Sequence, residues 1–330
     1  MTCIWRDSYF ESDDFYQLTL HVLSVIQVPL DIFGTYIIIR KTPKTMEKVK
    51  FTMLLLHLTS VWFDICLSIL TQPYIIFPAS SGYPLGLLRY LGIPMWFMTY
   101  MIVTSVFLVG CAVIMFFEER YNHLVRLDSE TQSRKVKRII FYIINYSITL
   151  SIMVPSFLDI PSLEVAQKLF LHDFPCFPPS IVNRPGFFTL TTNTNVLVMC
   201  MASYLTFGAG QMLFFFIKTS LFLHYTKAYS RRTSLMQKQL FKALSIQALV
   251  PLTILNFPCI YMNLSAAMNY VDMILSNISM IWMIAHGIVS TSIMLIVHKS
   301  YREATLEITG CRRLMKVITS SVSNSIVVTM

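Results

Sequence analysis

The sequence of 330 residues is poor in charge. Only 13% of its residues are Asp, Glu, Lys or Arg, about half of the roughly 25% found in soluble proteins. Mean hydropathy is +0.61, and 55% of the residues are hydrophobic. Disordered chains have the opposite composition, and a soluble protein could not cover its surface with so few polar groups. The composition therefore predicts a membrane protein.

Several chemical motifs are also missing. The seven cysteines include no C-x-x-C pair, so the spacing typical of zinc and redox sites is absent. The H-E-x-x-H motif of metalloproteases is absent, and ten glycines make phosphate-binding glycine loops improbable. We therefore expect no enzyme, no catalytic residues and no cofactor.

Seven long apolar runs are present instead. A spanning helix needs about 20 mostly apolar residues. The runs are too long and too uniformly apolar for barrel strands, so we predict an all-α seven-transmembrane helix bundle. The runs cover 18–39, 51–77, 91–117, 139–158, 193–217, 243–264 and 274–297. We accordingly divide the chain into an extracellular N-terminus (1–17), the bundle (18–297) and a cytoplasmic tail (298–330).

The cations are distributed unevenly between the two ends of the bundle. If the N-terminus lies outside, the inner segments 40–50, 118–138, 218–242 and 298–330 hold 22 of the 26 Lys and Arg residues. Cytoplasmic loops collect Lys and Arg, so we expect the N-terminus outside and the C-terminus inside. The basic groups then lie near membrane lipids and do not form one stripe, which argues against nucleic-acid binding.

Seven spans with an external N-terminus are typical of G-protein-coupled receptors. Other membrane proteins share the span count, and a multi-span transporter or channel is the alternative. Transporters often carry an internal repeat, and no repeat is evident between the two halves of this sequence. This absence favours the receptor.

Several short stretches resemble, in order, the nematode serpentine receptors of class H. They are Gly82–Leu88, Leu91–Pro94, Phe117–Asn122, Phe174–Pro178, His286–Gly287 and His298–Arg302. The resemblance implies a chemoreceptor in the plasma membrane of sensory neurons, and it implies no particular ligand. It also implies signalling through a heterotrimeric G protein. We expect the receptor to bind a small organic or peptide-like cue at its outer face.

The run Glu118-Glu119-Arg120-Tyr121 ends the third span and is similar to the acid–arginine–aromatic box of rhodopsin-like receptors. An arginine there can pair with a neighbouring carboxylate in the inactive state and meet the G protein in the active one. The alternative is a simple cation that favours the helix dipole.

Five Asp and His residues lie inside predicted spans, where charges are costly and usually face a partner. They are His21, Asp31, His57, Asp64 and His286. Estimated depths pair Asp64 with His286 and Asp31 with His57. No metal cluster is expected, although a sodium ion near Asp64 is one hypothesis. The alternative is a set of structural hydrogen bonds between helices.

A ligand pocket is expected to open outward between spans three, five, six and seven. An aromatic pocket with a few polar groups suits a small organic ligand. Aromatic residues near helix ends also form interface belts, which is the alternative. The candidate ligand-binding residues are Trp96, Tyr100, Thr104, Asn256, Tyr261 and Asn277.

Two cysteines, Cys3 and Cys176, fall outside the spans on the expected external side. By elimination they form a candidate disulfide, and two free thiols are the alternative. Cys311 lies beside Arg312 and Arg313 in the tail and is a candidate palmitoylation site.

Overall fold

The computed structural model describes residues 2–225, 231–268 and 270–310. Within these residues, seven helices are long and apolar enough to cross a membrane, which confirms the predicted bundle. They are α1 (Asp13–Lys41), α2 (Glu47–Ile65) with its π-helical continuation Cys66–Thr71, α3 (Met95–Val125), α4 (Gln132–Ser151), α6 (Thr194–Tyr225), α7 (Arg231–Met268) and α8 (Met273–Val297).

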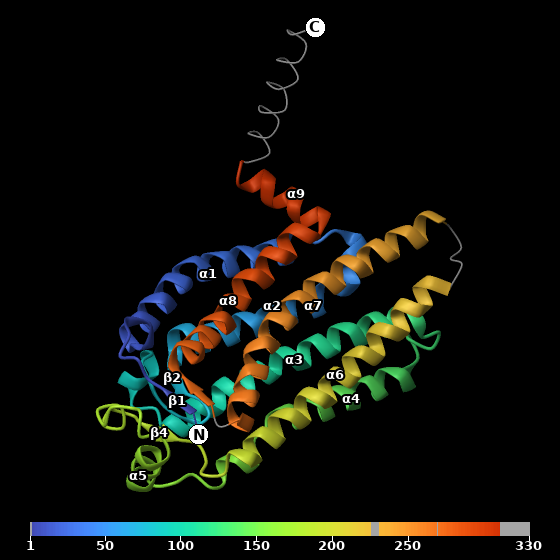
Figure 1. Ribbon diagram of the computed structural model, residues 1–330. Helices are drawn as coiled ribbons and strands as arrows, with labels where there is room; N and C mark the ends of the chain where they lie inside the picture. Colours follow the sequence, from blue (N-terminus) through green and yellow to red (C-terminus); the bar gives the residue numbers. More distant parts are fainter. Residues whose placement is uncertain (1, 226–230, 269, 311–330) are drawn as a thin grey trace, which may run out of the picture.

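The two ends of the bundle differ in structure. One end, called here the strand end, carries β1 (Thr2–Ile4), β2 (Pro73–Ile76), β3 (Ser81–Pro84), β4 (Phe188–Thr189), β5 (Tyr270–Asp272) and the short helix α5 (Leu163–Asp173). The other end carries α9 (Lys299–Ile308) and is called the α9 end. Figure 1 shows the N-terminus at the strand end and α9 at the opposite end.

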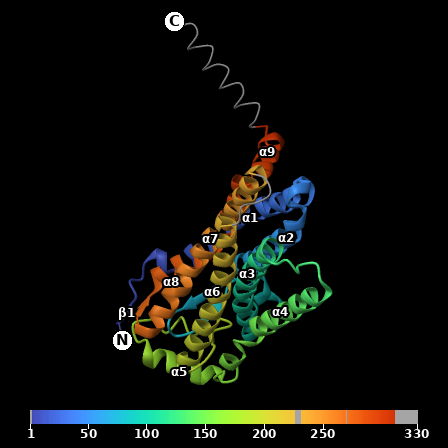
Figure 2. The same ribbon diagram turned by 90° about the vertical axis from the view of Figure 1, so that its right-hand side faces the viewer.

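Helix α3 is the most buried span and runs through the middle of the bundle. It packs against α2 and α6 along its length, and Figure 2 shows α4 beside it on the side away from α8. Two large apolar cores lie along the bundle, one at each end. Phe63 and Tyr74 belong to the core at the strand end, and Phe116 and Phe117 belong to the core at the α9 end.

The second span ends earlier than predicted. The apolar run continues to residue 77, but Gln72 adopts a left-handed backbone (φ 40°) that ends the helical segment at Thr71. Pro73–Ile76 then form β2, which pairs antiparallel with β3, and β3 pairs antiparallel with β4. Pro73, Tyr74 and Ile76 are therefore buried as part of this small sheet rather than in a membrane span.

Candidate functional site

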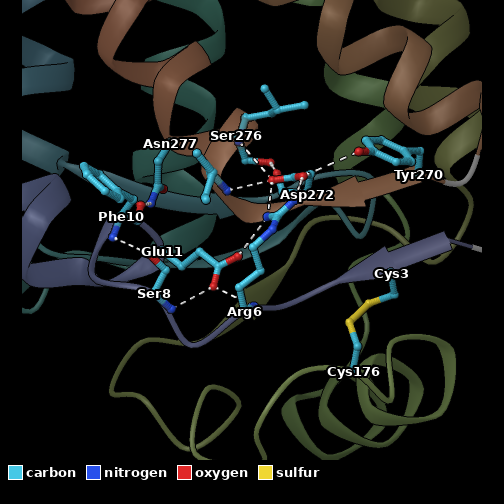
Figure 3. A network of polar contacts seen from close by, with 12 residues as sticks. Cys3, Arg6, Ser8, Phe10, Glu11, Cys176, Tyr270, Asp272, Ser276 and Asn277 are labelled. Carbon is cyan, nitrogen blue, oxygen red and sulfur yellow. Dashed lines mark hydrogen bonds and ion pairs between the residues drawn. A yellow bond between two sulfur atoms is a disulfide. The ribbon is translucent and has the colours of Figure 1, made fainter.

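The N-terminal segment of residues 2–12, called here the strap, crosses the strand end of the bundle. β1 pairs in parallel with β5, and Cys3 forms a disulfide with Cys176. Asn277 on α8 donates a hydrogen bond to the carbonyl oxygen of Phe10 (3.0 Å). Figure 3 shows the strap joined in this way to α8 and to the segment after α5.

An ion-pair network fixes the middle of the strap. Arg6 Nη2 lies 2.7 Å from Asp272 Oδ2, and Arg6 Nη1 lies 3.3 Å from Glu11 Oε1. Asp272 also caps α8 by accepting hydrogen bonds from the backbone amides of Ile274 and Leu275 (Figure 3). Burial alone would raise the pKa of Asp272, but the hydrogen bonds from Arg6 and these amides outweigh it and hold the pKa below its usual value.

A cavity with about 840 Å³ of empty space, counting its mouth, lies beneath the small sheet. Its walls come from α3, α6, α7 and α8, the four helices expected to surround a ligand pocket. Strands β2, β3 and β4 also contribute to the walls, through residues such as Ile75, Gly82 and Phe188. A Cβ at Gly82 would overlap the backbone of Tyr74, so only glycine allows β3 to lie this close to β2.

The face of α3 that was predicted to bind a ligand does not line this cavity. Trp96 is 49% exposed and packs edge-on against Phe97. The Tyr100 hydroxyl donates to the carbonyl oxygen of Leu150 on α4 (2.8 Å). Neither residue lines the cavity, and Thr104 is buried outside its walls. The α3 wall consists instead of Met95, Thr99, Ile102, Val103, Val106 and Phe107.

The other three candidate ligand residues have different positions. Asn277 lies under the strap, as described above. The Tyr261 hydroxyl is buried and has no hydrogen-bond partner among the described residues, but Tyr261 does not line the cavity. Asn256 lines a second cavity between α3, α6 and α7.

The polar groups inside the bundle lie near the partners expected from their depth. His286 Nδ1 is 3.7 Å from Asp64 Oδ1, an ion-pair distance but too long for a hydrogen bond. The Asp31 carboxylate accepts a hydrogen bond from Thr291 (2.8 Å), whereas His57 contacts the Asp31 backbone oxygen (3.1 Å). His57 and Asp31 therefore lie at the same level, as their depths predicted, and meet through the Asp31 backbone rather than through its carboxylate.

Asp64 occupies a tight, buried setting. A Cβ at Gly287 would overlap its carboxylate, and both carboxylate oxygens are buried with no hydrogen-bond partner among the described residues. The amide of Gln27 lies beside them and is equally unpaired in this part of the chain. Within the described ranges, no group of three or more His, Cys, Asp or Glu residues has metal-binding geometry. A sodium ion here would have Asp64 as its one charged ligand, so it stays a hypothesis.

At the α9 end, the acidic residues of α3 pair with α4. Glu118 accepts hydrogen bonds from Arg134 (2.8 Å), Arg138 (3.0 Å) and the Tyr142 hydroxyl (2.6 Å). Glu119 pairs with Arg138 and, at 2.6 Å, with His123. The three partners on α4 were not predicted as site residues. Their spacing of four residues, which places them on one helix face, was the available signal.

Arg120 is not paired with either carboxylate. It is buried, and its Nε and Nη2 atoms have no hydrogen-bond partner among the described residues. In this conformation, arginines of α4 pair with the carboxylates of Glu118 and Glu119, so the pairing of Arg120 with a neighbouring carboxylate in an inactive state stays a prediction. Tyr121 packs its ring against Phe214 and Phe215 of α6.

The segment after α8 packs back onto the bundle. His298 lies 2.6 Å from Gln247 of α7, and burial lowers the pKa of His298 to about 4, so its ring is neutral at pH 7. On α9, Tyr301 is buried and its hydroxyl lies 2.8 Å from Thr42. Cys311, the candidate palmitoylation site, lies outside the described residues.

Comparison with solved structures gives the class of this fold. Squid rhodopsin matches with a TM-score of 0.61 at 13% sequence identity, over 93% of this chain and 89% of the rhodopsin chain. The protein therefore has the fold of a G-protein-coupled receptor.

Comparison of sequences gives the family. Residues 11–311 match the family described as the serpentine type 7TM GPCR chemoreceptor Srh. Serpentine receptor class H-72 of Caenorhabditis elegans is 23% identical over 287 residues, which cover 85% of this chain and 81% of the relative. The chain belongs to the Srh family of serpentine chemoreceptors.

Proposed function

We propose that the protein is a plasma-membrane chemosensory receptor whose strand end faces outward, binds a small molecule and activates a heterotrimeric G protein at the α9 end. The family description supports a chemosensory role, and we propose sensory neurons as the cells that carry the receptor. The orientation is supported by the concentration of Lys and Arg in the segments at the α9 end. A disulfide at the strand end also fits an oxidising exterior.

The observation that carries this proposal is that α3 reaches both functional regions. Its first half lines the 840 Å³ cavity from Met95 to Phe107, and its last turns carry Arg120. A ligand that contacts the first half can therefore bias the position of Arg120 through one continuous helix. Because Arg120 is unpaired among the described residues, its guanidinium is available to a carboxylate or carbonyl oxygen of a partner.

The polar groups near Asp64 are assigned a role in the same change between inactive and active states. We propose that Asp64, His286, Asp31 and His57 join α1, α2 and α8 and that their contacts change between inactive and active states. Asp64→Asn keeps the shape but removes the charge. This substitution is expected to change basal signalling or ligand response, and unchanged values of both would reject the switching role.

The experiment is a G-protein activation assay in cells that express the receptor and are exposed to a panel of volatile and water-soluble compounds. At least one compound is expected to raise G-protein turnover in the parent receptor. Arg120→Ala should lose this response. Arg126→Ala, which removes an exposed cation paired with Asp128 near the same end, should keep it.

Two results would contradict the proposal. One is G-protein turnover by Arg120→Ala as high as that of the parent receptor at equal surface expression, which would show that Arg120 is not needed for G-protein activation. The other is net solute or ion flux through the purified protein without any G protein, which would favour a transporter or channel.

A further inference from the structure

The second cavity continues the first toward the α9 end. It holds about 570 Å³ of empty space between α3, α6 and α7. Val106, Phe107 and Cys259 line both cavities. The Phe107 ring stacks on Tyr204 with 4.1 Å between centroids, so this aromatic pair stands where the cavities meet. A molecule in the first cavity therefore lies next to the second.

The walls of both cavities carry no charge. None of the described residues that line them is Asp, Glu, Lys, Arg or His. An ion in such surroundings loses its hydration and gains no counter-charge, which is strongly unfavourable. The walls thus discriminate against carboxylates, phosphates and ammonium groups.

The few polar side chains of the first cavity already have partners. Ser81 Oγ is 2.7 Å from Thr189 Oγ1, and Thr99 Oγ1 donates to the carbonyl oxygen of Met95 (3.0 Å). A ligand therefore meets mainly carbon and sulfur. Methionine side chains are flexible and polarisable, so they adapt to apolar ligands of different shape. Those in the wall are Met95, Met201, Met262, Met280 and Met283.

The second cavity contains one free polar group. Asn256 on α7 lines it, and its side-chain amide makes no hydrogen bond to any other residue that the structure describes. The Tyr204 hydroxyl, which also lines this cavity, donates to the carbonyl oxygen of Phe107 (2.6 Å). Asn256 is thus the side chain that can recognise a polar group of the ligand, as donor or acceptor.

We propose that the receptor binds an uncharged, mostly hydrocarbon molecule that occupies the first cavity and bonds Asn256 through a single hydroxyl or carbonyl group. This inference rests on the proposed function for its biological meaning, but its test measures binding alone. It narrows the ligand class to neutral apolar compounds and excludes peptide-like cues, which carry many polar groups.

The test uses the full chain reconstituted in lipid nanodiscs and four probes of equal chain length: heptane, 1-heptanol, heptanoate and heptylammonium. Binding is followed by saturation-transfer NMR. Gly208 lines the second cavity, and a Cβ there would make only ordinary contact with Ile114. Gly208→Leu therefore fills the cavity. Gly210→Leu is the matched control, because Gly210 on the same helix faces open space. For heptanol and the two ions, specific binding is the part that Gly208→Leu removes and Gly210→Leu keeps. Heptane has no group for Asn256, so its total binding is compared.

The expected result is specific binding of heptanol, with both ions binding at least about 100-fold more weakly because each would be buried unpaired. Asn256→Leu should weaken heptanol about 3- to 10-fold, the effect of one neutral hydrogen bond, and leave heptane unchanged. Specific binding of either ion as tight as that of heptanol would overturn the inference. Absence of specific binding by neutral alcohols from four to twelve carbons would overturn it as well.

Failure of this inference is distinct from failure of the proposed function. Charged compounds that bind and activate a G protein would refute the ligand class and leave the receptor function intact. Neutral compounds that bind specifically without activating any G protein would support the ligand class and refute the proposed receptor function.

Discussion

The two ends of the bundle are held together in different ways. At the strand end, the links join segments far apart in the sequence: Cys3 with Cys176, Arg6 with Asp272, and Arg184 with Asp13. At the α9 end, the ion pairs among the described residues are local. The pair of Arg138 with Glu118, 20 residues apart, has the largest separation.

This difference fits the functions proposed for the two ends, namely ligand binding at the strand end and G-protein activation at the α9 end. Long-range links fix the strap, α5 and α8 around the ligand cavity, so the frame of the cavity does not depend on the positions of the helices at the other end. Local links at the α9 end hold α4 to α3. Among the described residues no ion pair joins α3 to α7, because Glu118 pairs with α4 and Glu119 pairs with Arg138 of α4 and with His123. The α9 end can therefore change its helix spacing without breaking a charged contact to α7.

The largest expected effect comes from breaking the strand end. Replacing Cys3 and Cys176 by Ser together should lower the free energy of unfolding by about 2–4 kcal/mol, because the disulfide closes a long loop. Thermal unfolding of the purified receptor measures this. Cys200→Ser, which removes a free cysteine of α6, is the control. An unchanged unfolding midpoint in the double variant would show that the strand end does not depend on this link.

The next effect concerns the α9 end. Glu118→Gln leaves Arg134 without its carboxylate and leaves Arg138 paired with Glu119 alone. A hydrogen bond to a charged group contributes about 1.5–3 kcal/mol. We expect this loss of stability together with faster amide exchange at the start of α4 and unchanged exchange in β1 and β5. Glu130→Gln, which removes an exposed carboxylate 3.7 Å from Lys135, serves as the control. Faster exchange in β1 would mean that the two ends are not independent.

The smallest effect is a pH dependence at the strand end. The pKa of Asp272 is lowered in the folded protein, so its ionised form contributes stability above the ordinary Asp pKa of about 3.9. This contribution is lost as the pH falls through the lowered pKa. Below about pH 4, the unfolding midpoint of the parent should therefore fall more steeply than that of Asp272→Asn. Parallel pH profiles would contradict the role of the Arg6–Asp272 pair.

The sequence predicted the number and order of the spans because a long apolar run has one main explanation in a membrane. Depth along a helix was also predictable, since the rise per residue is constant. The estimated depths placed Asp64 level with His286, and the two side chains lie 3.7 Å apart. The prediction of spans failed where an apolar run has two explanations. Pro73–Ile76 were assigned to a span but form a buried strand.

Rotation of a helix about its axis was not predictable from an evenly apolar helix. Trp96, Tyr100 and Thr104 do share a face of α3, but Tyr100 contacts α4 and not the cavity. Long-range partners were equally hidden. Arg120 was expected to meet a carboxylate next to it in sequence, but Arg134 and Arg138, which take the carboxylate of Glu118, come from another helix.

The account depends most on which end of the bundle faces the cell exterior. The direct measurement places one epitope tag before residue 1 and a second after residue 330, and stains intact and permeabilised cells with antibodies. The account predicts that the amino-terminal tag is stained in intact cells and that the carboxy-terminal tag is stained only after permeabilisation. An amino-terminal tag accessible only after permeabilisation would contradict it.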